Sequence, residues 1–195
     1  MYVEGGGSQD RTLRACKNAF GAFFQKLLGG SPKPKVVACG ARDDAYRDFC
    51  LSRRTDPDTF AILLVDSEDP VPTGKTRTAH LKDRERHWTE PMPEEQVHLM
   101  VQCMESWFLA DVGAMEAYYE QGFRRNALPQ NPKIEEIPRQ DVLAGLDNAT
   151  GATTKGTYHK TRHGFEMLAR LNPEKVRDRS PHAEALFMLL CEKLT

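Results

Sequence analysis

The feature that most constrains the fold is a run of six apolar residues, Phe60-Ala61-Ile62-Leu63-Leu64-Val65, which ends in the acid Asp66. A short run of this kind is typical of a strand that is buried on both faces of a parallel sheet. No apolar run in the chain approaches the roughly 18 residues that a membrane-spanning helix needs, so we expect no membrane partner.

Strand and helix patterns alternate through the first half of the chain. Three more strands are expected, at residues 2–4, 35–39 and 97–104. Helical patterns predict helices over residues 9–27, 41–54, 105–119, 140–148, 162–171 and 181–194. The polar segment between the third and fourth strands has room for one short helix around residues 78–87. Consecutive strand-helix-strand units imply right-handed crossovers. We therefore predict an α/β fold with a mainly parallel, Rossmann-like sheet that is flanked by helices.

The length of 195 residues favours one core with an added segment. We expect an α/β core over residues 1–125, interrupted by a polar, proline-framed insertion at about 67–95. Residues 126–195 are expected to form a helical C-terminal extension that packs on this core. The net charge of −1 argues against a protein whose whole surface coats nucleic acid, so the charge has to be examined segment by segment.

The cysteines and the N-terminus indicate a cytoplasmic protein. The five cysteines include no CxxC pair, which argues against structural zinc and against a thioredoxin-type redox centre. The first seven residues contain no basic start followed by an apolar stretch, so they do not form a secretory signal.

Acidic residues follow three of the predicted strands. Glu4 closes the first, Asp66, Glu68 and Asp69 follow the apolar run, and Glu105 follows the last. Ligands of parallel α/β sheets gather at the carboxyl ends of the strands, and clustered carboxylates favour a hard cation such as Mg²⁺ or Mn²⁺. The alternative is that these acids only stabilise the first turns of helices.

These acids also carry a family resemblance. Glu4-Gly5 after a first strand and the acid-x-acid pair at Asp66 and Glu68 resemble the TOPRIM fold of topoisomerases, bacterial primases and nucleases of the overcoming-lysogenization-defect type. The chain is similar to a bacterial domain-of-unknown-function family of small TOPRIM-like proteins, often encoded beside an ATPase, in the stretches 2–7, 36–40, 64–69, 97–111 and 155–163.

The resemblance implies roles for individual residues. Glu4 corresponds to the TOPRIM glutamate, which binds metal or acts in acid-base catalysis, and Asp66 to the first aspartate of the paired acids. Glu68 stands where the fold usually has Asp, which leaves the second ligand open between Glu68 and Asp69. Glu105 is similar to a downstream glutamate of TOPRIM nucleases. The implied catalytic residues are Glu4, Asp66 and Glu68, and the implied Mg²⁺ or Mn²⁺ ligands are these three with Asp69 and Glu105.

Two basic segments could contact phosphate groups. Residues 153–170 contain four Lys or Arg and one acid, and residues 73–88 contain five and two, so each segment carries a charge of +3. We expect nucleic acid to bind the first segment through Lys155, His159, Lys160, Arg162 and His163. The alternative is that both segments are solvated loops.

The residues and the resemblance together favour a metal-dependent TOPRIM-type nuclease that hydrolyses phosphodiester bonds in DNA or RNA. The resemblance adds an anti-phage defence setting and a partner ATPase. The alternative is a non-catalytic subunit of an ATPase-containing complex, which binds metal or phosphate and regulates its partner.

Overall fold

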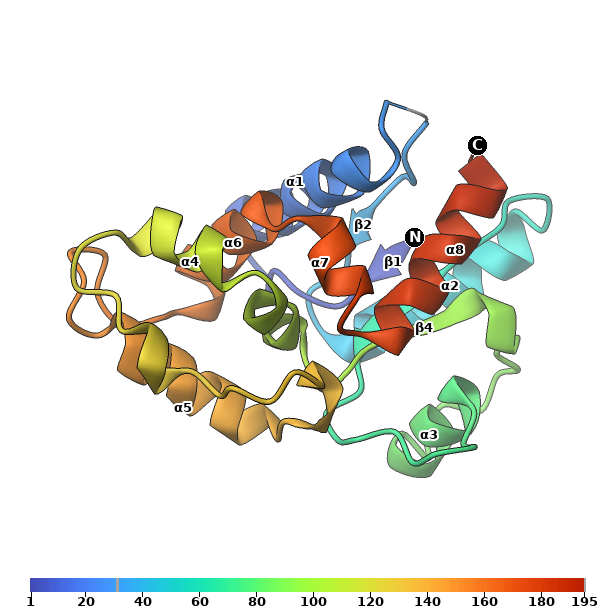
Figure 1. The fold of residues 1–195 in the computed structure, drawn as a ribbon. Helices are drawn as coiled ribbons and strands as arrows, with labels where there is room; N and C mark the ends of the chain where they lie inside the picture. The colour runs from blue at the N-terminus through green and yellow to red at the C-terminus, as the bar shows by residue number, and fades with distance from the viewer. Residues whose placement is uncertain (31, 195) are drawn as a thin grey trace.

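Four short strands form the central sheet of the computed structural model, which describes residues 1–30 and 32–194 (Figure 1). They are β1 (Tyr2–Val3), β2 (Val37–Ala38), β3 (Leu63–Asp66) and β4 (Val97–Met100), and their order in the sheet is β2-β1-β3-β4. All three pairings between neighbours are parallel, with Val3 beside Leu64 and Asp66 beside Met100. The prediction of an α/β fold with a parallel sheet flanked by helices is confirmed.

Eight α-helices are present in the described residues. They are α1 (Asp10–Leu27), α2 (Arg42–Thr55), α3 (Arg77–Arg84), α4 (Val112–Tyr119), α5 (Arg139–Thr150), α6 (Phe165–Arg170), α7 (Pro173–Arg177) and α8 (Pro181–Leu194). The helix that we expected over residues 105–119 is divided into a 3₁₀ helix, Met104–Ala110, and α4. The buried Asp111 stands at the break, where its carboxylate accepts hydrogen bonds from Asn172 N–H and from Lys175 Nζ. These tertiary contacts stabilise the break.

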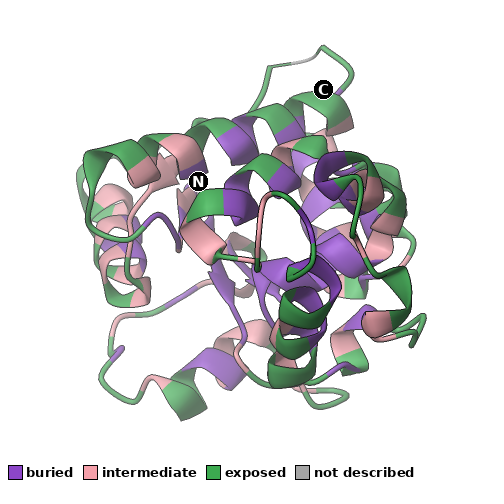
Figure 2. Cartoon of the chain, turned by 90° about the vertical axis from the view of Figure 1, so that its left-hand side faces the viewer, coloured by how far each residue is buried: buried purple, intermediate pink, exposed green. Residues whose placement is uncertain are grey.

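Residues of β3 contribute to hydrophobic clusters on both faces of the sheet. Leu64 belongs to the larger cluster, while Leu63 and Val65 belong to the smaller one, as the two-residue period of a strand requires. The larger cluster contains side chains of α1, α6 and α8, and the smaller one contains side chains of α2 and α3. Figure 2 shows these buried layers as purple segments beneath exposed helix surfaces. Residues 61–65 of the apolar run are thus buried because helices cover both of its faces, while Phe60 at its start is exposed.

The C-terminal helices share the larger cluster with the N-terminal part of the chain. The Phe23 ring lies 5.5 Å from the Trp107 ring and 5.7 Å from that of Phe187 on α8. The predicted boundary between residues 125 and 126 therefore divides residues of one cluster, and the two-part division stays a prediction. Among residues 1–30 and 32–194, no helix is both long and apolar enough to cross a bilayer.

Gly21 provides a stability test of α1. It lies in the helix interior, and a Cβ added there would meet Lys33 Nζ at 3.9 Å, an ordinary contact. Since glycine destabilises a helix interior by roughly 0.5–1 kcal/mol relative to alanine, Gly21→Ala is expected to raise the free energy of unfolding by that amount. Urea denaturation followed by circular dichroism measures it, and a lower midpoint in the variant would contradict the packing described for α1.

Candidate metal centre

Three carboxylates converge where β1 and β3 end. Glu4 directly follows β1, and its backbone N–H donates to Leu64 O of the neighbouring β3 at 3.1 Å. Asp66 is the last residue of β3, and Glu68 lies two residues beyond it. One carboxylate oxygen from each of Glu4, Asp66 and Glu68 lies within 4.8 Å of the others. The parallel pairing of two strands therefore brings together three of the five predicted metal ligands.

Arg42, at the start of α2, holds several of these acids. Its Nε lies 3.2 Å from Glu4 Oε2, and its Nη2 donates to Asp66 O at 2.7 Å and to Glu68 Oε1 at 3.2 Å. Its Nη1 donates to Glu85 Oε1 at 2.9 Å. Arg42 was not among the residues predicted from the sequence. Its position just after the second predicted strand, at the same edge of the sheet as Glu4, was the available signal.

Lys160 enters the same group from the C-terminal part of the chain. Its Nζ lies 3.2 Å from Asp66 Oδ2 and 3.9 Å from Glu105 Oε2. Asp66 and Glu105 are each only 1% exposed, so this lysine compensates two buried carboxylates. The Asp66 charge is the main cause that raises the pKa of Lys160 above its usual value. Tyr158 donates its hydroxyl to Glu105 Oε1 at 2.9 Å.

The sequence left the second metal ligand of the paired acids open between Glu68 and Asp69. The two residues have different surroundings in the structure. The Glu68 backbone has a φ of +66°, in the left-handed region, which costs a non-glycine residue on the order of 1 kcal/mol. Its carboxylate pairs with Arg42 and Arg139. Asp69 is exposed, pairs with Arg84 and lies outside the three-carboxylate group. The geometry favours Glu68.

We call Glu4, Asp66, Glu68, Glu85 and Glu105, with Arg42, Arg139 and Lys160, the acidic centre. When all are ionised, five carboxylates face three cations, so two negative charges are in excess. Burial, and then the charge of Asp66, raises the pKa of Glu4 to about 7. An oxygen-only donor set with excess negative charge suits a hard divalent cation, so the residues fit Mg²⁺ or Mn²⁺ held by Glu4, Asp66 and Glu68.

The five residues expected to bind nucleic acid have different surroundings in the structure. Lys160 belongs to the acidic centre, whereas Lys155 Nζ lies 5.0 Å from the centroid of the Tyr118 ring. His163 is buried, and its Nδ1 accepts the backbone N–H of His159 at 3.1 Å. His159 and Arg162 are exposed. Binding of nucleic acid by these five residues stays a prediction. Of Lys155, Lys160 and Arg162, only Arg162 is exposed, so its charge is the most accessible.

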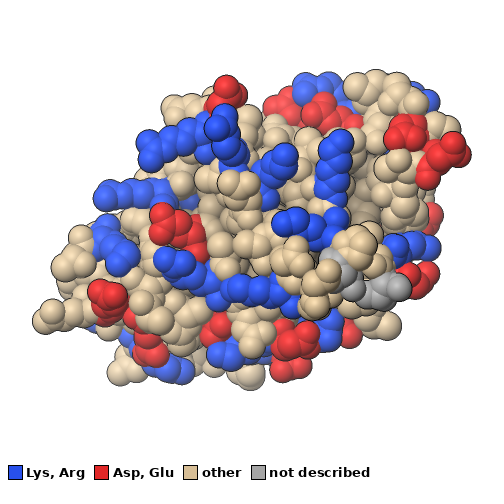
Figure 3. Space-filling model, turned by 90° about the horizontal axis from the view of Figure 1, so that it is seen from above, with Lys and Arg blue, Asp and Glu red and all other residues tan. Residues whose placement is uncertain are grey.

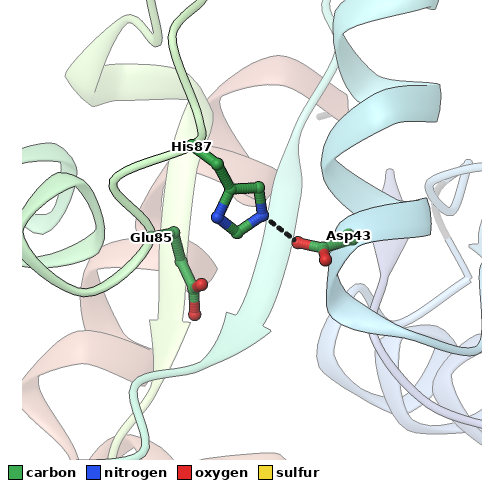
Figure 4. A group of neighbouring side chains, drawn as sticks. All are labelled: Asp43, Glu85 and His87. Atoms are coloured by element: carbon green, nitrogen blue, oxygen red, sulfur yellow. Dashed lines mark hydrogen bonds and ion pairs between the residues drawn. The ribbon is translucent and has the colours of Figure 1, made fainter.

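A second group of possible ligands, which was not predicted from the sequence, lies beside the acidic centre. His87 Nε2 lies 2.9 Å from Asp43 Oδ1, and Glu85 completes the group (Figure 4). Hydrogen bonds from Trp88 and His87 lower the pKa of Asp43. Glu85 also pairs with Arg42, so it joins this group to the acidic centre. Any metal titration of the protein therefore needs variants that separate the two groups.

A protein-family model matches most of the chain. The model described as "Domain of unknown function (DUF4276)" matches residues 3–190, which include the whole acidic centre and its neighbouring group. The chain belongs to this family. Among curated proteins and among solved structures, none is significantly similar to the chain.

In this DUF4276 protein, Gly164 permits the contact between Tyr158 and Glu105. A Cβ on Gly164 would lie 2.7 Å from Tyr158 Oη and 3.4 Å from Met104 Cε. Gly164→Ala is therefore expected to displace the tyrosine hydroxyl and to lower the free energy of unfolding by about 1–3 kcal/mol, as overpacking does. Urea denaturation measures the loss. Gly113→Ala is the matched control, since its Cβ would meet Asp111 Oδ1 at an ordinary 3.8 Å, and equal stability of the two variants would contradict the prediction.

Proposed function

We propose that this protein is a divalent-metal-dependent nuclease, related to TOPRIM nucleases, that hydrolyses phosphodiester bonds in nucleic acid. The observation that carries the proposal is the convergence of Glu4, Asp66 and Glu68 within 4.8 Å at the carboxyl ends of β1 and β3. This edge of a parallel α/β sheet is where ligands bind in such folds. The excess negative charge of the acidic centre also supports a bound cation.

A Mg²⁺ or Mn²⁺ ion in this site would polarise the phosphoryl oxygens and lower the pKa of a bound water. Glu4, whose pKa is raised to about 7, is suited to accept a proton from an attacking water near neutral pH. Arg42 and Lys160 are suited to neutralise charge that develops on the phosphate oxygens. Glu68 is held on a strained backbone by two arginines, which supports a role in the site rather than in the packing of the core.

One feature favours the alternative function of a non-catalytic subunit. Arg42 and Lys160 already form ion pairs with Glu4, Asp66 and Glu68, so much of the negative charge is compensated within the protein. Such a site could bind metal or the phosphate of a partner without turnover. A defence role with a partner ATPase completes the proposal, and the resemblance of the motifs to TOPRIM-like proteins is its support. A cytoplasmic location is also proposed, and the cysteine pattern of the sequence supports it.

A nicking assay distinguishes the two functions. Purified protein is incubated with supercoiled DNA, and separately with a structured RNA, in Mg²⁺, Mn²⁺ or EDTA. Cleavage that requires the metal supports the nuclease. Metal binding without cleavage of either substrate supports the regulatory subunit.

The site of metal binding is tested by thermal unfolding with and without millimolar Mn²⁺. An ion that binds only the folded protein raises the midpoint by mass action. We expect Asp66→Asn to remove this increase and His87→Ala to retain it. The reverse result would place the ion at Asp43, Glu85 and His87 instead.

The affinity for Mn²⁺ is expected to rise with pH. With a pKa of about 7, Glu4 is mostly protonated at pH 6 and mostly ionised at pH 8, and the ion must displace that proton. Binding at pH 8 should therefore be about tenfold tighter than at pH 6. In the metal-free protein, the titration of Glu4 changes the stability in the opposite direction. Because its pKa is raised in the folded state, the free energy of unfolding falls as the pH rises from about 4.5 to about 7. Calorimetric titrations at both values measure the ratio, and Glu4→Gln should bring it close to one.

A further inference from the structure

A groove runs between α1 and the segment of residues 33–38, which leads into β2. Two adjoining hollows of about 530 and 340 Å³ form it, and both are lined by Lys17, Lys35 and Val36. Lys33 lines the larger hollow and Arg14 the smaller one. We call this feature, with Arg14, Lys17, Lys33 and Lys35, the basic groove.

Most Lys and Arg side chains of the protein form an ion pair or a hydrogen bond, but the four cations of the basic groove have no such partner within residues 1–30 and 32–194. All four are exposed, and none of their side chains forms an ion pair or hydrogen bond with another described residue. Asp10 is the one acid among the lining residues of the two hollows. Figure 3 shows Lys and Arg side chains across the middle of this side of the molecule, with Asp and Glu between and around them. The groove therefore presents uncompensated positive charge.

The shape of the groove suits an extended chain. Arg11, Arg14 and Lys17 follow one another at intervals of three residues, so they lie along one face of α1 over about 9 Å. Gly21 is buried and leaves the larger hollow open, since only Lys33 Nζ, at 3.9 Å, would meet a Cβ there. Across the groove, β2 is the edge strand of the sheet and pairs with β1 alone.

The basic groove is also directed toward the acidic centre. α1 is the crossover helix that follows β1, and Gly5, Gly6 and Gly7 lie between Glu4 and its first turns. Its N-terminal end, with the exposed Arg11, therefore lies at the edge of the sheet where Glu4 stands. A polyanion that follows the cations from Lys33 to Arg11 is led to that edge.

We infer that the basic groove binds the phosphate backbone of single-stranded nucleic acid and directs it to the acidic centre. The inference rests on the proposed nuclease function in its choice of ligand, and it deepens that function by assigning the substrate path. A positively charged groove that follows the backbone is the usual feature by which proteins hold single strands. Backbone phosphates carry no base identity, so the binding is expected to be independent of sequence.

The test is fluorescence anisotropy with a labelled 20-nucleotide single-stranded DNA, the RNA of the same sequence and the matched duplex, all in EDTA so that no cleavage occurs. The variant is the double substitution Lys17→Ala with Lys35→Ala. The control is Arg54→Ala with Arg125→Ala, which removes the same two charges from exposed surface ion pairs elsewhere. Circular dichroism verifies that both fold.

We expect the groove variant to bind single strands about tenfold more weakly at low salt, and its log–log salt slope to flatten by about 1.4, at roughly 0.7 per lost contact. The control should differ from the wild type by less than twofold. Equal weakening in both variants, or tighter binding of the duplex than of either single strand, would overturn the inference. So would binding of anionic vesicles or of polyglutamate that exceeds the binding of nucleic acid.

The outcome is separable from that of the proposed function. If the groove variant loses binding while the wild type cleaves nothing, the groove stands and the nuclease does not. If the wild type cleaves and the groove variant cleaves with unchanged KM, the nuclease stands and the groove does not. When both hold, the variant raises KM and leaves kcat unchanged, because the lost contacts lie away from the reacting atoms.

Discussion

Glu4→Gln is expected to lower metal-dependent cleavage about a thousandfold and to leave the fold intact. Removal of a positioned acid-base group alone costs roughly 10²–10⁴ in rate. The effect on stability should be small, because Glu4 Oε2 accepts hydrogen bonds from Arg42 Nε and from Asp66 N–H, and an amide oxygen can accept both. Glutamine also resembles the protonated form, which a pKa of about 7 already populates near neutral pH.

The cleavage rate of supercoiled DNA in Mn²⁺ is the measurement for this variant. Glu95→Gln, an exposed change beyond the acidic centre, is purified in parallel and should keep the wild-type rate. Full activity in Glu4→Gln would mean that the nuclease activity arises elsewhere in the protein or from a contaminant. Equal loss in both variants would point to a defect of the preparation.

The main lines of the fold were predictable because local patterns and burial agree. The apolar run at residues 60–65 indicated a strand covered on both faces, and side chains from both clusters lie against β3. The division of the expected helix at Asp111 was not predictable. It depends on hydrogen bonds to Asn172 and Lys175, which lie more than 60 residues away in the sequence.

Four of the five acids of the acidic centre could be predicted, while Glu85 and the arginine partners of the acids could not. Parallel strands end at one edge of the sheet, so Glu4 and Asp66 were expected to be neighbours. Arg42 and Arg139 reach Glu68 from α2 and α5, across 26 and 71 residues of sequence, and no local pattern links them. Asp69 follows β3 by only three residues and was therefore a ligand candidate, yet Arg84 pairs with it at the surface.

Charges that are counted along a segment do not show how they are distributed in space. The basic stretch at residues 155–163 includes Lys160, which points into the acidic centre, and Arg162, which is exposed. Both residues lie in the same π-helical turn, Lys160–Gly164. Conversely, Lys17 and Lys35 are 18 residues apart in the sequence but line the same hollow. A surface of this kind is visible only once the fold is known.

Lys160→Met is expected to lower the free energy of unfolding of the metal-free protein by about 3 kcal/mol. The substitution keeps much of the side-chain volume but removes the cation that faces Asp66 and Glu105, which are both 1% exposed. Breaking a buried pair from one side costs roughly 3–5 kcal/mol because a buried charge is left uncompensated. The partial exposure of Lys160, at 38% of its side chain, places the expected loss at the lower end.

Urea denaturation in EDTA measures this loss. Two further variants test whether the loss arises from the uncompensated charge. Lys160→Arg keeps the charge and should lose less than half as much. Adding Asp66→Asn to Lys160→Met should recover part of the stability, since one of the two uncompensated charges is then gone. A loss below 1 kcal/mol in Lys160→Met would contradict the buried pairing.

Mn²⁺ is expected to stabilise Lys160→Met more than it stabilises the wild type. Without the lysine, the acidic centre has three negative charges in excess, so it should attract a divalent ion more strongly than the wild type does. Millimolar Mn²⁺ is therefore expected to raise the thermal midpoint of Lys160→Met by more than that of the wild type. If Mn²⁺ raises both midpoints equally, the ion binds away from Lys160, and the group of Asp43, Glu85 and His87 becomes the stronger candidate for the metal. If the increase is larger in the variant, Lys160 and the metal ion compete for the Asp66 carboxylate. Metal binding in the wild type then requires the ion to replace the Lys160 ammonium as the cation that neutralises Asp66.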